Sequence, residues 1–388
     1  MKIKVAIIDH LGAHGSSHHF YLFGQAIGLI NSGVDVSLYT NSKTHDPKIK
    51  QLKFFQFYKD IFLKHNKFLS AIRYLSGSIF SHLHAKKNGC KVFHYHIFGF
   101  SVLVLFNMLL AKICFGKIVL TIHDVRSFAN PDSSKIYTKL IYALTDKILT
   151  HNNYSKHEIV KFHTDIEHKI NVIPHGNYLP FIIKQVNKKK SRKKIGLDTD
   201  GKVILFFGMI KKVKCLDLLL KAMPEVIKEN EHITLLIAGK PWKDDFSNYQ
   251  QIIDELSIAK SCVLHINFIN HEDVEHYYCA SDLVVLPYSK IYQSGVLMMS
   301  LSYGKPVVLS DLEAFKEVVE DHKHAFFFVS GNKKSLSEII IKALNSPVLL
   351  DEITSNGLAL MENSFSWDKI GAQTKAAYLK INYFYKGK

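Results

Sequence analysis

Short apolar segments alternate with longer segments of helical periodicity along most of this 388-residue chain. The short segments have the length of single strands, and the segments between them are long enough for helices. Such alternation is typical of a parallel α/β sheet that helices cover on both faces. The first half predicts strands at 3–8, 34–39, 91–95, 117–122, 147–150 and 170–173, and helices at 17–31, 52–85, 100–114, 133–145 and 154–163. The second half predicts strands at 203–207, 233–239, 263–268, 282–287, 306–309 and 325–329.

The alternation stops after Pro174 and restarts near residue 203. Between these points, residues 184–194 read KQVNKKKSRKK, which predicts a solvated surface loop or linker. We therefore expect two doubly wound, Rossmann-like domains facing a cleft, an N-terminal one at 1–185 and a C-terminal one at 186–365. The last helix, within 366–388, has its own apolar face and is expected to pack back on the N-terminal domain. Ligands of such sheets bind beyond the carboxyl ends of the strands.

The composition is that of a folded, basic protein. Lys and Arg number 50 against 34 Asp and Glu, so the formal charge of +16 indicates an anionic partner. A specific nucleic-acid partner is not expected, because zinc-finger spacing, RNA-binding signatures and basic heptads are missing from the sequence. The five cysteines form no CxxC pair, which is typical of thiols in a reducing, cytoplasmic compartment.

Three segments bear on membranes. The apolar run at 3–8 is too short for a signal-peptide core, so export is not expected. Residues 98–115 reach the edge of membrane-spanning length, but apolar runs on both sides favour a buried helix. Residues 51–75 mix aromatic, aliphatic and basic side chains. They predict either an amphipathic helix that lies on anionic lipid, at the inner face of the plasma membrane, or a helix whose apolar face belongs to the core.

Two loops of the first half carry candidate site residues. Gly12, His14, Gly15 and Ser16 follow the first strand, where glycines let the backbone approach a phosphate and aim N–H groups at it. A tight turn with a serine cap explains this loop equally well. His123 and Asp124 follow the strand at 117–122, where the histidine suits a sugar hydroxyl and the carboxylate suits a base or an orienting partner. A purely structural turn is the alternative.

Two loops of the second half favour a diphosphate. Gly208 ends an apolar strand, and Lys211 and Lys214 follow it before a helix begins. Lysine charges and the helix dipole then converge on one point. Ser294 and Gly295 begin a helix of small residues after another strand, and the first N–H groups of that helix suit phosphate oxygens.

These motifs together resemble those of the GT-B glycosyltransferases. The segments are IHD at 122–124, IPHGNY at 173–178, FFGxxxxxK at 206–214 and PYxxxxxSGVLxxxLSYGKPVV at 287–308. The pattern is most similar to glycosyltransferase family 4, in the bacterial surface-polysaccharide branch that has an SG motif instead of paired glutamates. The resemblance implies hexosyl transfer from a UDP- or GDP-sugar to a glycan or polyprenyl-diphosphate-linked acceptor. It also implies retention of configuration, with no bound metal and no cofactor.

The resemblance also implies roles for individual residues. The C-terminal domain would hold the nucleotide and the N-terminal domain the acceptor. Lys214 and Lys211 would contact the diphosphate, and His123 would touch the transferred sugar. Glu317 would lie near the nucleotide or sugar of the donor. If the reaction inverts configuration instead, Asp124 or Asp9 is the candidate base.

The sequence departs from the family at several positions. The paired glutamates fall on Ile291 and Met299, and a common arginine and a common glycine are replaced by Met209 and Cys215. These departures leave open a non-catalytic GT-B subunit that binds glycan or nucleotide and supports a partner transferase. A nucleotide-sugar epimerase of similar architecture is a third alternative, but its motifs are not visible here.

Overall fold

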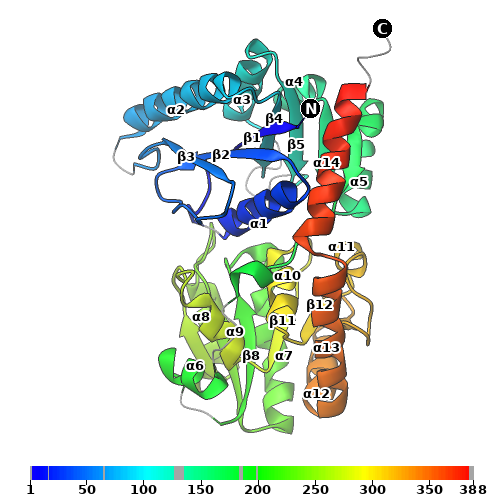
Figure 1. The fold of residues 1–388 in the computed structure, drawn as a ribbon. Helices are drawn as coiled ribbons and strands as arrows, with labels where there is room; N and C mark the ends of the chain where they lie inside the picture. The colour runs from blue at the N-terminus through cyan, green and yellow to red at the C-terminus, as the bar shows by residue number, and fades with distance from the viewer. Residues whose placement is uncertain are drawn as a thin grey trace. The chain divides into compact units, whose positions relative to one another are not determined.

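The structure is a computed structural model that describes residues 2–15, 17–63, 66–125, 135–182, 187–197 and 200–383. The chain divides into two compact units, each considered separately below (Figure 1). Unit 1 comprises Met1–Gly176 and Phe365–Lys388, and unit 2 comprises Asn177–Ser364. Ser16 and residues 64–65, 133–134, 184–186 and 384–388, which belong to segments considered above, lie outside the described residues.

Unit 1 is built on a parallel sheet of seven strands in the order β3-β2-β1-β4-β5-β6-β7. Its strands are β1 Lys4–Ile8, β2 Asp35–Asn41, β3 Lys53–Tyr58, β4 Val92–Ile97, β5 Lys117–Ile122, β6 Lys147–Thr150 and β7 Ile170–Val172. The six strands predicted for this half are confirmed. The order runs outward from β1 in both directions, which is the doubly wound pattern.

The prediction of one helix over 52–85 is wrong in its first part. Residues Lys53–Tyr58 form β3, the edge strand beside β2, and the helix α2 spans only Lys67–Lys87. The aromatic residues of β3 pack on the sheet, and the ring of Phe55 stacks on that of Tyr39 with centroids 5.1 Å apart. A half-buried edge strand shows apolar residues on both faces, so its composition alone does not distinguish it from a helix.

The other helices of unit 1 are α1 His18–Asn31, α3 Val102–Ile113, α4 Lys135–Leu144, α5 Asn153–Val160 and α14 Trp367–Tyr383. The last of these packs closely against α1 through glycines. A β-carbon placed on Gly28 would lie 1.9 Å from the carbonyl oxygen of Trp367, and one on Gly371 would lie 2.1 Å from the backbone of Gly28. Neither position has room for a side chain. The C-terminal segment is therefore an integral part of unit 1.

Unit 2 repeats the same topology with six parallel strands in the order β10-β9-β8-β11-β12-β13. Its strands are β8 Lys202–Phe207, β9 Ile233–Ala238, β10 Cys262–His265, β11 Leu283–Leu286, β12 Val307–Ser310 and β13 Phe326–Phe328, and all six were predicted. Its helices are α6 Lys188–Lys194, α7 Leu216–Glu229, α8 Ser247–Glu255, α9 Val274–Ala280, α10 Gly295–Ser302, α11 Glu313–Lys316, α12 Lys333–Leu344 and α13 Pro347–Asn363.

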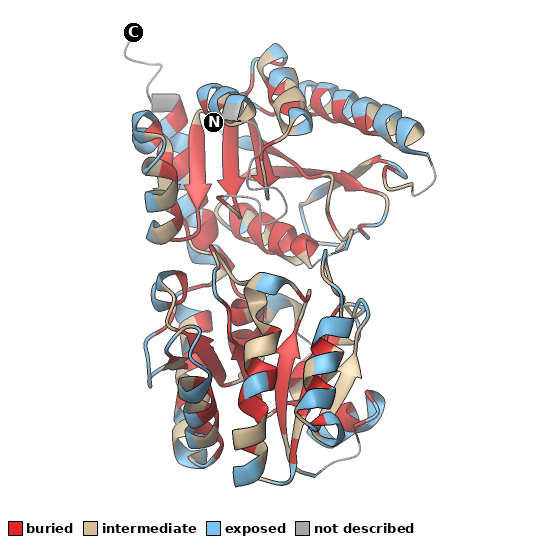
Figure 2. Ribbon diagram, turned by 180° about the vertical axis from the view of Figure 1, so that it is seen from behind, coloured by how far each residue is buried: buried red, intermediate tan, exposed pale blue. Residues whose placement is uncertain are grey.

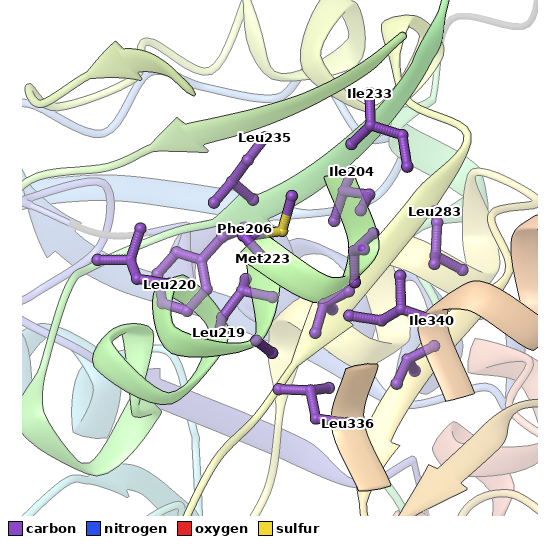
Figure 3. Packing of buried hydrophobic residues seen from close by; sticks show 14 of the residues in the cluster. Ile204, Phe206, Leu219, Leu220, Met223, Ile233, Leu235, Leu283, Leu336 and Ile340 are labelled. Carbon is purple, nitrogen blue, oxygen red and sulfur yellow. The ribbon is translucent and has the colours of Figure 1, made fainter. Parts of the chain in front are cut away.

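The core of unit 2 lies between the sheet and the helices α7 and α12 (Figure 3). One face of α7 supplies Leu219, Leu220 and Met223, all fully buried, against Ile204 of β8 and Leu336 of α12. These α7 positions recur at helical spacing, so a single face of the helix enters the core. This packing fixes α7, and with it the loop that joins β8 to α7.

The basic run at 184–194 is not a solvated loop in its described part, so that prediction is wrong. Residues Lys188–Lys194 form α6, which Asn187 caps by accepting the N–H groups of Lys189 and Lys190. Arg192 is buried and donates to Asp282 at 2.9 Å and to the carbonyl of Gly201 at 2.9 Å. A buried, paired arginine therefore anchors the run to the sheet.

The segment 98–115 forms α3 and its flanking turns, and it is less buried than predicted. Asn107, Met108 and Ala111 face the interior, whereas Val102 and Ile113 are exposed. Among the described residues, no helix combines the length and the apolarity that a membrane span requires. The expected helix is confirmed, but its complete burial is not.

Candidate functional site

Each sheet has a point where the strand order reverses, between β1 and β4 in unit 1 and between β8 and β11 in unit 2. Loops that leave the carboxyl ends of such strand pairs diverge and leave a crevice for ligands. Most of the predicted site residues follow one of these four strands or the neighbouring strands β5 and β12. The topology therefore brings them to two places, one on each unit.

In unit 2, the loop after β8 turns sharply at Gly208, where φ is +93°. The chain then forms a short 3₁₀ turn at Lys212–Lys214 before α7 begins. Cys215 precedes α7 with φ of +50°, a left-handed conformation that favours glycine. The glycine that the glycosyltransferase pattern has at this position would adopt this backbone without strain. Cys215 adopts it at some cost in strain.

The loop after β8 and the start of α10 meet at Gly208. A β-carbon placed on this residue would lie 3.2 Å from Nζ of Lys214 and 3.4 Å from Cγ2 of Val296, in the first turn of α10. The side-chain oxygen of Ser294 accepts the backbone N–H of Leu297 at 3.1 Å and so caps α10. The structure thus brings the loop of Gly208 and Lys214 next to the start of α10, where Ser294 and Gly295 lie.

The two lysines of this loop have different surroundings. Lys214 is half-buried with its ammonium 5.2 Å from the ring centre of Tyr288, and that of Lys211 lies 4.7 Å from the ring centre of Trp242. Burial, with a smaller contribution from the charge of Lys211, lowers the pKa of Lys214 to about 7. An anion beside Lys214 would relieve this destabilisation of the charged form.

Aromatic residues that were not named as site candidates lie beside Gly295 and the two lysines. A β-carbon on Gly295 would lie 3.0 Å from the hydroxyl of Tyr178, whose backbone N–H donates to Ser302 Oγ of α10 at 2.9 Å. Tyr178 closes the segment IPHGNY, so that motif pointed to it. Tyr288 likewise belongs to the quoted segment that begins with PY at 287–288. Trp242 carried no comparable signal, because its position depends on the loop after β9.

The other unit 2 positions considered above, the predicted Glu317 and the three positions that depart from the family pattern, lie on several elements. Glu317 ends the short helix α11 after β12, and its side chain is exposed. Met299, at one position of the paired glutamates, is buried within α10, and Ile291 lies in the loop before it. Met209 follows Gly208 directly.

In unit 1, the glycine loop after β1 is held tightly by its own side chains. Asp9 is 2% exposed and accepts the N–H of Gly12 at 2.7 Å, and Thr44 accepts the N–H of Ala13 at 2.9 Å. A β-carbon on Gly12 would lie 1.9 Å from Thr44 Oγ1, so the turn requires glycine. Two N–H groups of this loop are therefore used within the unit.

The other loop residues point in different directions. His14 stacks on Phe62 with ring centres 3.5 Å apart, and burial, with a smaller effect of Lys43, lowers its pKa. Gly15 has φ of +69° and open space where a side chain would be. Ser16 lies outside the described residues.

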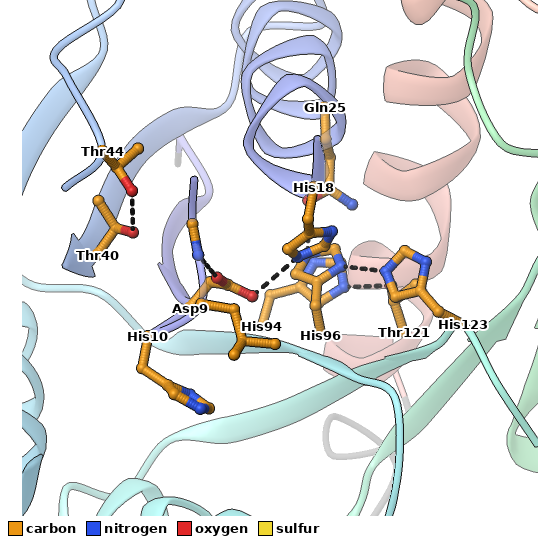
Figure 4. Close-up of polar contacts among 12 residues, drawn as sticks. Asp9, His10, His18, Gln25, Thr40, Thr44, His94, His96, Thr121 and His123 are labelled. Carbon is orange, nitrogen blue, oxygen red and sulfur yellow. Dashed lines mark hydrogen bonds and ion pairs between the residues drawn. The ribbon is translucent and has the colours of Figure 1, made fainter. Parts of the chain in front are cut away.

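His123 lies in a chain of buried histidines at the carboxyl edge of the unit 1 sheet (Figure 4). Its Nε2 and His96 Nδ1 share a hydrogen bond of 3.1 Å, and its Nδ1 and His151 Nε2 share another of 3.1 Å. Both ring nitrogens are thus engaged within the unit. A hydrogen bond from His123 to a sugar hydroxyl would have to replace one of them.

A carboxylate lies beside this chain. Asp9 Oδ2 lies 2.9 Å from Nε2 of His18, the first residue of α1. Burial alone would raise the pKa of Asp9, but the charge and hydrogen bond of His18 outweigh it and lower that pKa. Asp9 is therefore held as a carboxylate that accepts hydrogen bonds within unit 1. Asp124 follows His123 and is half-buried.

Burial holds the histidines of the chain in their neutral form. It lowers the pKa of His151 to about 4, and those of His96 and His123 well below the usual range, with neighbouring histidines adding to the effect. The chain gathers His96, His123 and His151 from three adjacent strands, whereas the sequence singled out only His123. Each of them lies at or just after a strand end, and this position was the available signal.

Comparison with known proteins assigns part of the chain to a family. Residues 187–359, most of unit 2, match the family described as glycosyl transferases group 1. An uncharacterized glycosyltransferase of Methanocaldococcus jannaschii is 26% identical over 255 residues, covering 64% of each chain. A phosphatidyl-myo-inositol mannosyltransferase of Mycobacterium leprae is 25% identical over 183 residues, covering 46% of each. The matched segments span less than two thirds of the first of these relatives and about half of the second.

Solved structures match nearly the whole chain. Sucrose-phosphate synthase of Thermosynechococcus elongatus has a TM-score of 0.76 at 16% identity, covering 99% of this chain and 100% of that one. HepE of Anabaena, solved in complex with UDP-glucose, has a TM-score of 0.75 at 16% identity, covering 97% and 99%. These likenesses confirm the predicted fold class, GT-B, with two Rossmann-like α/β domains.

Proposed function

We propose that this chain, which carries a glycosyl transferases group 1 domain at residues 187–359, moves a sugar from a UDP- or GDP-sugar to an acceptor hydroxyl. The observation that carries the proposal is the meeting of Lys214 and the start of α10 at Gly208. A cation and the N-terminus of a helix beside a glycine without a side chain suit a diphosphate. The solved neighbour HepE in complex with UDP-glucose supports a nucleotide-sugar donor.

The bond that breaks joins the anomeric carbon to the diphosphate, and negative charge grows on the departing oxygen. In our proposal Lys214 donates to this oxygen and the first N–H groups of α10 add partial positive charge. Lys211 contributes positive charge at the edge of this diphosphate site. In this proposal these groups stabilise the negative charge on the diphosphate, and no metal is needed there. Glu317 contacts the nucleotide or sugar in this proposal.

The acceptor side of the proposal rests on unit 1. We assign retention of configuration, with the departing phosphate accepting the proton of the acceptor hydroxyl. Under inversion, the candidate base is Asp124 or Asp9, and Asp9 also accepts the N–H of Gly12 and contacts His18. In our proposal one ring nitrogen of His123 exchanges its histidine partner for a hydroxyl of the sugar, and the other histidine holds the ring in place.

Helix α2 supports a lipid-linked acceptor and peripheral contact with an anionic membrane. Phe68, Ile72, Leu75, Ile79 and Leu83 form one exposed apolar stripe along it, with exposed fractions from 39% to 78%. The spacing of three or four residues places all five on one face, and Figure 2 shows exposed residues along one side of this helix. Basic side chains flank the stripe at Lys67, Arg73, Lys86 and Lys87. The prediction of an amphipathic basic helix over 51–75 was wrong for Lys53–Tyr58, which form β3, but it holds from Lys67 onward, where α2 begins and continues to Lys87.

A groove of about 660 Å³ adjoins this face, between β3 and α2. Apolar walls come from Phe57, Phe80 and Leu83, and cations come from Lys59, Arg73 and Lys87. A polyprenyl diphosphate presents the same combination of apolar chain and anionic head. We therefore place the enzyme in surface-polysaccharide synthesis, at the inner face of the plasma membrane.

Two experiments test these proposals separately. Donor turnover is measured by release of UDP or GDP from a panel of nucleotide sugars, with hydrolysis as the background reaction. Turnover of one donor, lost in Lys214→Ala, supports the transferase. Tight nucleotide binding without any turnover would favour the non-catalytic subunit, which the missing glutamates at Ile291 and Met299 also suggest.

Membrane contact is measured by flotation with vesicles that contain anionic phospholipid. We expect the triple variant Phe68→Ser, Ile72→Ser, Leu75→Ser to bind at least about 10-fold more weakly, because each buried CH₂ contributes to lipid binding. The matched control replaces exposed apolar residues of unit 2, Phe268→Ser and Val348→Ser. Equal loss in both variants would contradict a specific role for α2.

A further inference from the structure

The hydrogen bond between His123 and His151 continues to the backbone of unit 1. His151 Nε2 lies 3.1 Å from His123 Nδ1, and His151 Nδ1 lies 3.2 Å from the carbonyl oxygen of Ile173. His123 directly follows β5 and His151 directly follows the neighbouring strand β6, so the sheet sets the spacing of the two rings. Their exposed fractions are 5% and 7%, which keeps water from competing for these contacts.

The carbonyl of Ile173 determines which ring nitrogen of His151 carries the proton. A carbonyl oxygen only accepts hydrogen bonds, so His151 Nδ1 has to donate. Burial lowers the pKa of His151 to about 4, although the bond to Ile173 opposes this shift, and the neutral ring carries a single proton. His151 Nε2 is therefore an acceptor, and the proton of its contact with His123 belongs to His123 Nδ1.

The same reasoning assigns the tautomer of His123. Burial, with a smaller effect of the neighbouring histidines, lowers the pKa of His123 well below its usual range, so this ring is also neutral. Its one proton is on Nδ1, and Nε2 carries a lone pair. That lone pair faces His96 Nδ1 at 3.1 Å (Figure 4). The backbone of Ile173 thus sets the tautomer of His123 through His151.

A proton count over the whole chain of histidines agrees with this assignment. Four contacts lead from the amide of Gln25 through His96, His123 and His151 to the carbonyl of Ile173. Three neutral imidazoles supply three protons, and an N–H of the Gln25 amide, turned to donate to His96 Nε2, supplies the fourth. Each contact then holds one proton, and all four bonds point toward Ile173.

We propose that His151 is a positioning residue of the transfer reaction, which holds His123 in the tautomer whose Nε2 accepts a hydrogen bond from a hydroxyl of the transferred sugar. This inference rests on the proposed function, in which His123 contacts that sugar. A hydroxyl is both donor and acceptor, so one that enters between the rings donates to His123 Nε2 and accepts from His96 Nδ1. The other tautomer of His123 would leave two buried lone pairs facing each other at His151, which is costly.

The first test reads the tautomers by nitrogen NMR of the ring atoms in the full-length protein, because protonated and bare ring nitrogens give different signals. We expect His123 and His151 each to carry the proton on Nδ1. His151→Phe removes the acceptor, so the His123 signals should move toward a mixture of tautomers. His151→Gln offers an amide oxygen in its place and should keep the wild-type tautomer. A wild-type His123 with its proton on Nε2 would overturn the proposal, even if a variant fails to fold.

The second test measures transfer by the same variants. We expect His151→Phe to lower kcat/KM by about 10-fold, the effect of losing one buried hydrogen bond, and His151→Gln to restore most of it. The control His82→Phe removes another buried histidine of unit 1, whose ring nitrogens contact the carbonyl of Ser78 and the hydroxyl of Tyr95. It should leave both kcat/KM and the tautomer of His123 unchanged. An equal loss in His82→Phe and His151→Phe would show a merely structural effect and overturn the positioning role.

The two tests separate this inference from the proposed function. The NMR measurement uses neither donor nor acceptor, so the wrong tautomer refutes the role of His151 and leaves the transferase standing. A wild-type protein that turns over no nucleotide sugar refutes the proposed function instead. Full activity of His151→Phe in a protein that does transfer sugar would overturn the inference alone.

Discussion

The two sheets share one topology, yet their carboxyl edges carry different chemistry. Unit 2 presents Lys214 and the start of α10 around Gly208, a place suited to an anion. Unit 1 presents histidines that hydrogen-bond one another around His123, with Asp9 alongside. The doubly wound fold fixes where side chains gather, and the residues at the strand ends decide what they bind.

Lys214, at the carboxyl edge of the unit 2 sheet, is expected to have the largest effect on the rate of transfer. Lys214→Ala should reduce transfer by about 10²-fold, because it removes one donor that stabilises charge on the departing phosphate. Lys212→Ala is the matched control, since Lys212 is exposed in the same 3₁₀ turn. Steady-state turnover measures both. Equal activity in the two variants would remove Lys214 from the mechanism.

The packing of α14 on α1 is expected to be sensitive to one added methyl group at Gly28. Gly28→Ala should lower the free energy of unfolding by about 1–3 kcal/mol, because its β-carbon overlaps the carbonyl of Trp367. In unit 2, the β-carbon of Gly357→Ala would lie 2.9 Å from a terminal methyl of Leu301 and at ordinary contact distance, 3.6 Å, from the carbonyl oxygen of His324. The terminal methyl can shift and the substitution gains helix propensity, so it should be neutral or stabilising. Thermal unfolding compares them. A neutral Gly28→Ala would show that α14 packs more loosely on α1.

Donor binding should depend on pH through Lys214. Its pKa of about 7 makes the ammonium mostly charged near pH 6 and mostly neutral near pH 8.5. The affinity for a nucleotide sugar, whose diphosphate does not titrate in this range, should therefore fall about 10-fold as pH rises between these values. Calorimetric titration at both pH values measures it, and the Lys214→Ala variant should give a flat profile. A flat wild-type profile would separate Lys214 from the diphosphate.

The smallest effect is expected at Lys211. Its ammonium lies over Trp242 at the edge of the loop, so Lys211→Ala should weaken donor binding by only about 3-fold. The measurement is the same titration, and Lys243→Ala, whose ammonium also lies near Trp242, is the control. A loss as large as that of Lys214→Ala would make Lys211 the main diphosphate ligand.

The sequence predicted every strand except β3. Buried parallel strands appear as short apolar runs, whereas β3 is a half-buried edge strand and its aromatic residues were assigned to a helix. The burial of Arg192 in α6 was also missed, because its partner Asp282 lies far along the chain. Pairings of this kind follow from the fold and cannot be read from local composition.

The candidate site was predictable on unit 2 and only partly so on unit 1. Gly208, Lys214 and Ser294 belong to continuous motifs, and the structure brings them together. His123 was singled out, but its partners His18, His96 and His151 come from separate segments that only the strand order unites. The role of each residue in the reaction stays a prediction.

Unit 2 is proposed to bind a nucleoside diphosphate through Lys214 and the first N–H groups of α10. The most direct test is calorimetric titration of the purified protein with UDP and with GDP, each with and without Mg²⁺. We expect tight binding of one of the two nucleotides, unchanged by Mg²⁺ and lost in Lys214→Ala. Binding of neither nucleotide, or binding that requires Mg²⁺, would contradict it.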